Sequence, residues 1–384
     1  MISPKIGLIF VGGFPEGDVH NSRIKNIGLA FKNQGWICDF ISLYPSSYSK
    51  NNNSPFQIEW KSCKVIHIGG WYRYPKTFFS RIVQFIYCHI SFLWFMIKNV
   101  RRYDILYFYT PQWSSSLLGL VLAHRLGAKT IVDYTDLHSA SSYPVIHQSE
   151  ESYIIKHSSA LLVISDYLFS HFLDKHSNIH QLPMMINFDD FQQKNEATPF
   201  HIGYIGSFGA KDDLLLVYKA LKIALRSEPR IKLVLIGNDP KPRLTEEQLK
   251  NFGIESHVIR IGRVKHSAIS YQLQQCDTFI MNRTNSIFSD SGYPAKLGDY
   301  LACNRPILMS DGKGFSQDFT HKKEVFKYKQ DDHEDLAKAM IYRYNNMDEM
   351  NTMAEQAYVF AKNHFDYKRV TTQIISVAVD LLKS

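Results

Sequence analysis

The chain has 384 residues, of which 45% are apolar and 21% charged, and its net charge is +8 at pH 7. This composition is typical of a folded protein and excludes an intrinsically disordered one. The length exceeds one ordinary domain, so two domains are expected. The positive charge is spread out, without an arginine-rich arm, zinc-finger spacing or RNA-binding aromatic signature. Anionic ligands or an anionic membrane surface are therefore favoured over nucleic acid.

The cysteine pattern and the N-terminal sequence indicate in which cellular compartment the protein is expected. The five cysteines are scattered and never form a Cys-x-x-Cys pair, so neither a disulfide framework nor a zinc site is indicated. The first apolar run is soon broken by Gly12, Gly13 and Pro15, which is poor for a signal peptide and favours a first strand. We therefore expect a cytoplasmic protein.

Short β-branched and aromatic runs alternate with helical patterns along most of the chain. Such alternation predicts an α/β protein with parallel sheets covered on both faces. A polar stretch around 186–199 interrupts the alternation, which then restarts. We expect two doubly wound Rossmann-like domains facing each other across a cleft. The predicted strands are KIGLIFV, ICDFISL, CKVIHI, DILYFY, KTIVDY and ALLVIS in the first half, and HIGYIGS, IKLVLIG, HVIRIG, DTFIM and RPILMS in the second.

The restart of the pattern sets the domain boundaries. The N-terminal domain is predicted over 1–187, a linker over 188–198 and the C-terminal domain over 199–365. The final segment, 366–384, is helical in pattern and is expected to pack back on the N-terminal domain.

One apolar stretch lies between Phe78 and Arg102. It has no charge between Arg81 and Lys98, which is shorter than the roughly 20 residues that a membrane-spanning helix needs. A transmembrane helix is therefore not expected. Two interpretations remain open: a buried helix packed on a sheet, and an interfacial helix with basic flanks lying peripherally on the inner face of the cell membrane.

The loop after the strand at 202–205 has features of a phosphate site. It contains Gly206, Gly209 and Lys211, and Asp212 is placed to cap the next helix. Free amides at a helix start beside a lysine suit a phosphate. Glycines at strand ends also serve simple tight turns, and the loop is neither a dinucleotide fingerprint nor a Walker loop.

A second loop follows the strand that ends at Asn282. Pro294 is predicted at a first helical position, where its missing N–H costs nothing. The free amides and Lys296 then converge on one point. Asp299 lies a little over one helical turn from Pro294 and could accept hydrogen bonds from a ribose diol. The alternative is that Lys296 and Asp299 are ordinary surface or capping residues.

The order of these motifs resembles a known family. The segments IGYIGSFGAKDD, LVLIGND, IRIGRV, QQCDTFIMN and SGYPAKLGDYLACNRPILMSD look like the donor-binding domain of retaining glycosyltransferases of the GT-B fold, family 4 in particular. In the first half, FPEGDVHNSRIKNIGLAFKNQGW, VISDYLFSHF and LPMMINFDDF are similar to the family's opening helix, closing strand and hinge. The resemblance covers nearly the whole chain; its motifs are degenerate, but their order is specific.

The resemblance implies roles in donor binding. Lys211 matches the family's phosphate-binding lysine, whereas Ser207 replaces its usual arginine. Asp299 matches the second acid of a pair that holds the ribose; the first acid falls at Ser291, so the pair is broken, and Asp290 could substitute. The implied donor-binding residues are Gly13, Gly206, Ser207, Asn282, Asp290, Ser291, Gly292, Tyr293, Pro294, Ala295 and Asp299.

The resemblance also implies residues for chemistry. Asp136 stands where relatives carry a His or Asp facing the reacting sugar, and His138 lies two residues on. Either could bind the acceptor or stabilise charge at the sugar carbon. Lys211 and Lys296 would stabilise the departing diphosphate, and Asn21 and Arg23 are expected to bind the acceptor.

The implied reaction is transfer of a sugar from a UDP- or GDP-linked donor to a hydroxyl of a glycan or lipid-linked acceptor. The resemblance implies retention and a place in cell-surface polysaccharide or glycoconjugate synthesis. No metal or cofactor is expected, because the acidic clusters look like helix starts and a hinge. Two alternatives stay open: a catalytically inactive GT-B-like partner subunit, since Ser207 and Ser291 depart from the family, and a sugar-nucleotide epimerase.

Overall fold

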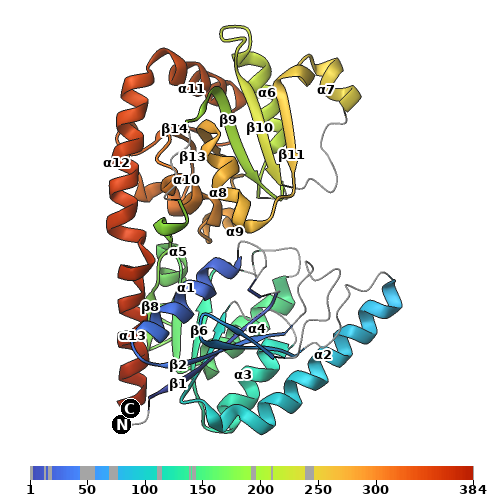
Figure 1. Ribbon diagram of the computed structural model, residues 1–384, viewed down its shortest axis with the longest axis vertical. Helices are drawn as coiled ribbons and strands as arrows, with labels where there is room; N and C mark the ends of the chain where they lie inside the picture. The colour runs from blue at the N-terminus through green and yellow to red at the C-terminus, as the bar shows by residue number, and fades with distance from the viewer. Residues whose placement is uncertain are drawn as a thin grey trace. The chain divides into compact units, whose positions relative to one another are not determined.

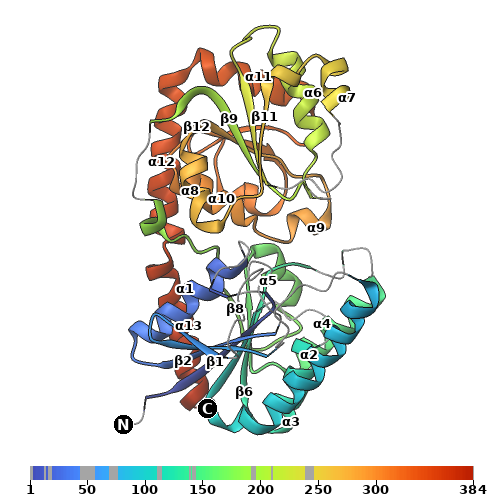
Figure 2. The same cartoon turned by 45° about the vertical axis from the view of Figure 1, so that its right-hand side comes forward.

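The computed structural model describes residues 3–12, 14–15, 20–43, 57–68, 77–109, 115–137, 140, 144–191, 196–208, 211–237 and 246–383. The chain forms two compact units, one of residues 1–185 with 367–384 and the other of residues 186–366. Each unit has its own largely parallel sheet with helices packed around it (Figures 1 and 2). The predicted α/β class with two Rossmann-like domains is confirmed.

The sheet of the first unit has the strand order β3-β4-β2-β1-β5-β6-β7-β8. Neighbouring strands pair in parallel except β3 and β4, which form an antiparallel edge. The strands are β1 (Lys5–Phe10), β2 (Ile37–Ser42), β3 (Gln57–Trp60), β4 (Cys63–His67), β5 (Ile105–Tyr109), β6 (Lys129–Tyr134), β7 (Ala160–Val163) and β8 (Ile179–Gln181). The helices are α1 (His20–Asn33), α2 (Phe78–Asn99), η1 (Val100–Arg102), α3 (Ser115–Arg125), α4 (Pro144–His157), α5 (Asp166–Phe172) and α13 (Tyr367–Lys383).

The sheet of the second unit is parallel throughout, with the order β11-β10-β9-β12-β13-β14. Its strands are β9 (Thr198–Gly206), β10 (Lys232–Gly237), β11 (Val258–Gly262), β12 (Cys276–Met281), β13 (Ile307–Asp311) and β14 (Phe326–Lys329). Its helices are η3 (Phe188–Phe191), α6 (Leu214–Ala224), α7 (Glu246–Phe252), η4 (Glu255–His257), α8 (His266–Gln274), α9 (Ile287–Asp290), α10 (Ala295–Ala302), η5 (Gly314–Asp318), α11 (His333–Asn345) and α12 (Met347–Phe365).

The second sheet changes direction between β9 and β12. The chain runs outward from β9 through β10 to β11, returns to β12 beside β9, and then runs outward on the other side. In an open parallel sheet, the loops at such a point diverge and leave a crevice at the carboxyl ends of the strands. The loops after β9 and β12 are therefore the place to look for a ligand site in this unit.

Every predicted strand is present, but three strands were not predicted. These are β3, β8 and β14, of four, three and four residues. All three lie at or beside a sheet edge, where the pattern of burial is weak: β3 and β8 contain no fully buried residue. Short edge strands take their structure from pairing with a neighbour, and such pairing leaves little periodicity in the sequence.

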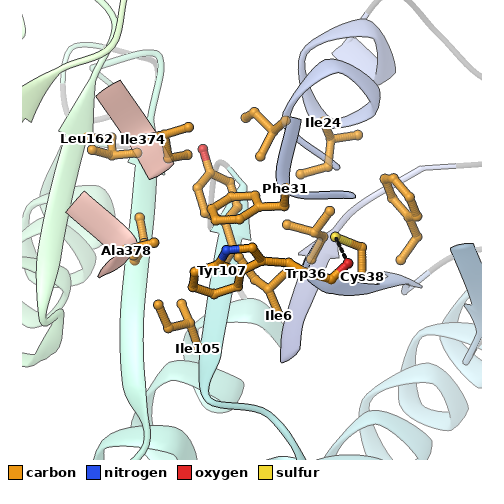
Figure 3. Close-up of a cluster of buried hydrophobic side chains, with 14 of the residues drawn as sticks. Ile6, Ile24, Phe31, Trp36, Cys38, Ile105, Tyr107, Leu162, Ile374 and Ala378 are labelled. Carbon is orange, nitrogen blue, oxygen red and sulfur yellow. Dashed lines mark hydrogen bonds between the residues drawn. The ribbon is translucent and has the colours of Figure 1, made fainter. Parts of the chain in front are cut away.

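Helix α13 lies in the first unit and completes its core. Its apolar positions recur at helical spacing, and Val370, Ile374, Ala378 and Leu381 are buried in the cluster that also holds residues of β1, β5 and α1. Figure 3 shows Ile374 and Ala378 near Leu162 and Phe31 in this cluster. The first core is thus built from both ends of the chain.

We predict that Ile374→Ala destabilises the first unit by about 3 kcal/mol, because the side chain is fully buried and its removal leaves a cavity. The control is Ile375→Ala at the next, partly buried position, for which we expect a loss of about 1 kcal/mol. All five tryptophans lie in the first unit, so intrinsic fluorescence during urea unfolding reports on this unit alone. Equal losses for the two variants would contradict the packing of α13.

Candidate functional site

A buried cluster of charged side chains lies where β9 and β12 end. Lys296, from the first turn of α10, donates a hydrogen bond from Nζ to Asp212 Oδ1 at 2.6 Å. Arg283, just after β12, has Nη1 3.8 Å from the same oxygen. The side chains of these three residues are 8–13% exposed. The loop after β9, the end of β12 and the first turn of α10 therefore bring two cations and one carboxylate together.

Glycines allow this close approach. A Cβ added to Gly206, the last residue of β9, would lie 3.4 Å from Lys296 Nζ and 3.2 Å from Asp212 Oδ2. Gly237 ends β10 with φ +139°, and a Cβ there would overlap the carbonyl oxygen of Gly206. Larger residues would push the strand ends apart. The glycine that the sequence marked as a turn thus also opens space directly beside an ammonium group.

Burial and charge shift the pKa values of the cluster in a consistent way. Burial lowers the pKa of Lys296 to about 8; attraction to Asp212 opposes this, and repulsion from Arg283 adds to it. Burial raises the pKa of Asp212, but Lys296 and Arg283 outweigh it, so that the carboxyl is more acidic than usual. One carboxylate faces two cations, and the cluster carries an excess positive charge that suits an anion.

Lys211 has a different immediate partner. Its Nζ lies 3.6 Å from the centre of the Phe288 ring on α9, and its carbonyl oxygen accepts a hydrogen bond from the amide of Thr284. The loops after β9 and β12 are thereby joined. Lys211 is adjacent in sequence to Asp212, so its backbone borders the charged cluster, while its ammonium group rests on an aromatic face.

One local prediction was wrong. Asp212 does not cap helix α6; Asp213 does, and its side chain accepts a hydrogen bond from the amide of Leu216 at 3.1 Å. Asp212 is instead occupied by Lys296 and Arg283. The sequence does not show which of the two consecutive acids, Asp212 or Asp213, caps the helix. The structure shows it, because Lys296 and Arg283 lie beside Asp212.

Asn282 and Pro294 hold the framework of the site. Asn282 is buried, donates from Nδ2 to the carbonyl oxygen of Asp213, and accepts from the hydroxyl of Tyr328. Both ends of its amide are therefore engaged within the domain. Pro294 is the N-cap of α10, one position before the first helical position that was predicted for it, and Ala295 is an exposed first residue of that helix.

The loop between α9 and α10 carries the other predicted donor-binding residues. Ser291 and Gly292 are buried, and Asp290 is 7% exposed. Burial raises the pKa of Asp290, with a partly opposing effect from Lys313. The backbone of Asp290 abuts Gly314, where a Cβ would overlap its carbonyl oxygen. Tyr293 donates its hydroxyl hydrogen to Asp318 at 2.9 Å.

Asp299 is a half-buried acid with one fully buried carboxylate oxygen. Its Oδ2 is buried and has no hydrogen-bond partner within the protein. Burial raises its pKa to about 7, and Asp190 on η3 adds to this rise. A buried carboxylate oxygen without a partner is costly, and such a group is satisfied when a ligand supplies hydroxyl donors. Ser207 directly follows β9 and is exposed.

In the first unit, Arg23 has a structural role. Its guanidinium donates two hydrogen bonds to Asp133 on β6 and one each to the carbonyl oxygens of Leu182 and Pro183. Arg23 is 7% exposed, and Asp133 is completely buried and also accepts from Tyr107. Four of the five guanidinium N–H groups are thus used within the unit, which favours a structural role for Arg23 over the predicted binding of an acceptor.

The remaining predicted residues of the first unit lie near strand ends. Asn21 is buried at the start of α1 beside Gly12. Asp136 is half-buried, two residues after the end of β6. Gly13 and His138 lie outside the described residues.

Arg283 is the site residue that the sequence interpretation missed. It stands in the segment RTNSIFSDSGY, next to Asn282 at the end of β12. A signal was available: a basic residue directly after a central strand of a parallel sheet lies at the edge where ligands bind. Only the strand order, which places β12 beside β9, shows that Arg283 meets Asp212.

Comparison with known proteins identifies the kind of domain that carries this cluster. Residues 185–360 match the family model "Glycosyl transferases group 1". The whole chain has the GT-B fold. The matched residues include the whole charged cluster, so the part of the chain that carries the cluster is similar to group 1 glycosyltransferases. Membership of family 4 stays a prediction.

Several solved glycosyltransferases resemble the whole chain in structure. Sucrose-phosphate synthase from Thermosynechococcus elongatus has a TM-score of 0.76 at 16% identity, over 99% of both chains. HepE from Anabaena, solved with UDP and glucose, has a TM-score of 0.73 at 13% identity, over 98% of this chain and 99% of the other. TarM reaches 0.76 at 10% identity, over 98% and 99%. No curated protein matches the chain in sequence.

We predict that Lys296 titrates near pH 8, far below the ordinary lysine value of about 10.4, because it is buried next to Arg283. The measurement is NMR of protein labelled with [ε-¹³C]lysine, with Lys296→Arg to assign the signal. Asp212→Asn should lower the midpoint further, because it removes the attraction that opposes burial. Saturating sulfate, an anion that does not titrate in this range, should raise it. A spectrum in which every lysine titrates above pH 9.5 would contradict the geometry.

We predict that Asp299→Asn stabilises the second unit at pH 8. The pKa of Asp299 is about 7 in the folded state and about 3.9 in the unfolded state, so the folded state holds an extra proton between these values. The free energy of unfolding therefore falls as the pH rises from about 4 to 7 and stays lower above 7. The variant should gain on the order of 2 kcal/mol at pH 8 and nothing at pH 4. Calorimetric melting at both pH values tests this, and equal gains at both would show that ionisation of Asp299 is not involved.

Proposed function

We propose that this protein is a glycosyltransferase that moves a sugar from a UDP-linked donor to a hydroxyl group of a glycan or lipid-linked acceptor, with retention of the anomeric configuration. The observation that carries the proposal is the cluster of Lys296, Arg283 and Asp212 at the ends of β9 and β12. Uridine is chosen because HepE was solved with UDP and TarM with UDP as well. The lipopolysaccharide enzyme WaaG, at 13% identity, supports a role in cell-surface polysaccharide synthesis.

The charged cluster would bind the diphosphate. As the bond between the sugar carbon and the diphosphate breaks, negative charge builds on the departing oxygen, and Lys296 and Arg283 would stabilise it. Lys211 would add a third cation after a shift of its ammonium group from the Phe288 ring. The extra arginine at position 283 would compensate for Ser207, which replaces the arginine of the family pattern. Only interactions that strengthen in the transition state raise the rate.

Asp299 would hold the nucleoside. A ribose offers two neighbouring hydroxyl donors, and the unpartnered Oδ2 of Asp299 could accept from them. A ribose hydroxyl would thus satisfy the one buried oxygen of Asp299 that has no partner in the protein. Asp290, buried one residue before Ser291, would contact the sugar in place of the first acid of the family's pair.

The acceptor side would use residues of the first unit. Asp136 would orient the acceptor or stabilise positive charge at the sugar carbon, and His138 and Asn21 would assist. The acceptor oxygen forms the new bond to the sugar carbon, and its proton passes to the departing phosphate oxygen. We propose that no metal ion takes part, since Lys296 and Arg283 would supply the positive charge, and we expect turnover in EDTA to equal turnover in its absence.

We predict that purified protein releases UDP from a UDP-sugar in the presence of an acceptor and that Lys296→Gln lowers kcat/KM by at least about 100-fold. Arg283→Gln should cost a similar factor. The control is Lys329→Gln, which removes a 78% exposed lysine at the end of β14 in the same sheet and should change kcat/KM less than twofold. Asp299→Asn should raise KM for the donor while it raises the melting temperature.

The product decides between the alternatives. NMR of the glycoside should show the anomer of the donor, and the opposite anomer would overturn retention but not transfer. Formation of an epimeric UDP-sugar without acceptor would establish an epimerase. Binding of UDP without turnover of UDP- or GDP-sugars would establish an inactive partner subunit.

A further inference from the structure

Helix α2 exposes a long apolar face. Phe79, Ile86, Ile90 and Ile97 are 75%, 51%, 63% and 59% exposed, and their spacing of seven, four and seven residues places them in one line along the helix. Trp94, 60% exposed, lies beside this line. We call these five residues the apolar stripe. Single exposed apolar residues are ordinary, but a continuous stripe over five turns marks an interaction surface.

The opposite face of α2 is fixed to the first unit. Gln84, Cys88, Phe92 and Met96, spaced by four residues, are buried. Phe92 packs over α3 so closely that a Cβ on Gly119 would lie within 2.5 Å of its ring. Figures 1 and 2 both show α2 alongside α3 in the first unit. The stripe cannot rotate inward without breaking this packing, and the interpretation of α2 as a wholly buried helix is wrong.

The charges around the stripe are all positive. Between Phe78 and Arg102 the chain has no Asp or Glu, whereas Arg81, Lys98, Arg101 and Arg102 flank the apolar residues. Arg101 and Arg102 are exposed on η1, directly after α2. Lys98 places its Nζ 4.2 Å over the ring of Trp94. Aromatic and aliphatic groups with basic residues at their edge are what the headgroup region of an anionic membrane accommodates.

We propose that α2 lies in the interface of an anionic membrane, with the apolar stripe among the acyl chains and the basic residues on lipid phosphates. A second copy of this chain fits less well, because another α2 would bring four more cations and no acid to pair with them. Phe78–Arg102 is also the one described helix that is long and apolar enough to cross a membrane by length and composition. Crossing would require the buried face to leave the core, so a helix lying in the plane is the arrangement that keeps the fold intact.

We predict that the full-length protein sediments with vesicles of phosphatidylcholine and phosphatidylglycerol at 3:1 and about tenfold less with phosphatidylcholine alone. The double variant Ile86→Glu/Ile90→Glu should lower the partition coefficient at least tenfold. Val359→Glu, at a 57% exposed position of α12 in the second unit, is the matched control and should bind as the wild type does. Arg101→Gln/Arg102→Gln should lose most of the preference for anionic vesicles.

Fluorescence locates the contact. Vesicle binding should shift the emission of the wild type to the blue, and Trp94→Phe should remove most of the shift while sedimentation persists. Three results would overturn the proposal: equal sedimentation of the double variant and Val359→Glu, retention in the pellet after alkaline carbonate, which indicates a spanning helix, or a dimer in solution that ignores vesicles and dissociates in the double variant. Unchanged sedimentation of the arginine variant would overturn its electrostatic part.

Discussion

The ion pair between Lys296 and Asp212 organises the second unit's site. It joins the loop after β9 to the first turn of α10, and Arg283 brings in the end of β12. A buried pair of this kind contributes little to stability, because each group loses its hydration. The pair instead fixes where the two groups lie. The Asp212 carboxylate also helps Lys296 stay protonated, although burial favours the neutral amine. Because the cluster has two cations and one carboxylate, it carries a net positive charge that suits an anionic ligand.

The second unit also contains a carboxylate oxygen without a hydrogen-bond partner in the protein, Oδ2 of Asp299. The residue is half-buried, its Oδ2 is buried without a partner in the protein, and the raised pKa of its carboxyl reflects the cost of charging it there. Such unsatisfied groups collect at binding sites, where stability is given up for recognition. The first unit shows the contrasting case. Arg23 donates to Asp133 and to two neighbouring carbonyl groups, and these hydrogen bonds join α1 to β6 and to the chain after β8.

The sequence was sufficient for the strands that carry a buried pattern and for the loops after them. It was not sufficient for β3, β8 and β14, which depend on pairing at sheet edges. It predicted Lys296 and Asp299 as site residues but did not single out Arg283, because only the strand order places the end of β12 beside β9. The ion pair of Arg23 was not predicted for a related reason: its partner is the buried Asp133 within KTIVDY, 110 residues away in the sequence. Single-sequence patterns describe local structure and leave such distant pairs undetermined.

The composition of the first unit from two distant segments affects how the chain is made. On the ribosome, residues 1–185 emerge first, yet their core lacks α13 until the last residues leave the exit tunnel. The second unit is continuous in sequence and can fold as soon as it has emerged. Until α13 is available, the first unit stays incompletely folded, with the apolar surface of α1 uncovered. The order of folding would then be the reverse of the order of synthesis, and nascent first units would be natural clients for chaperones.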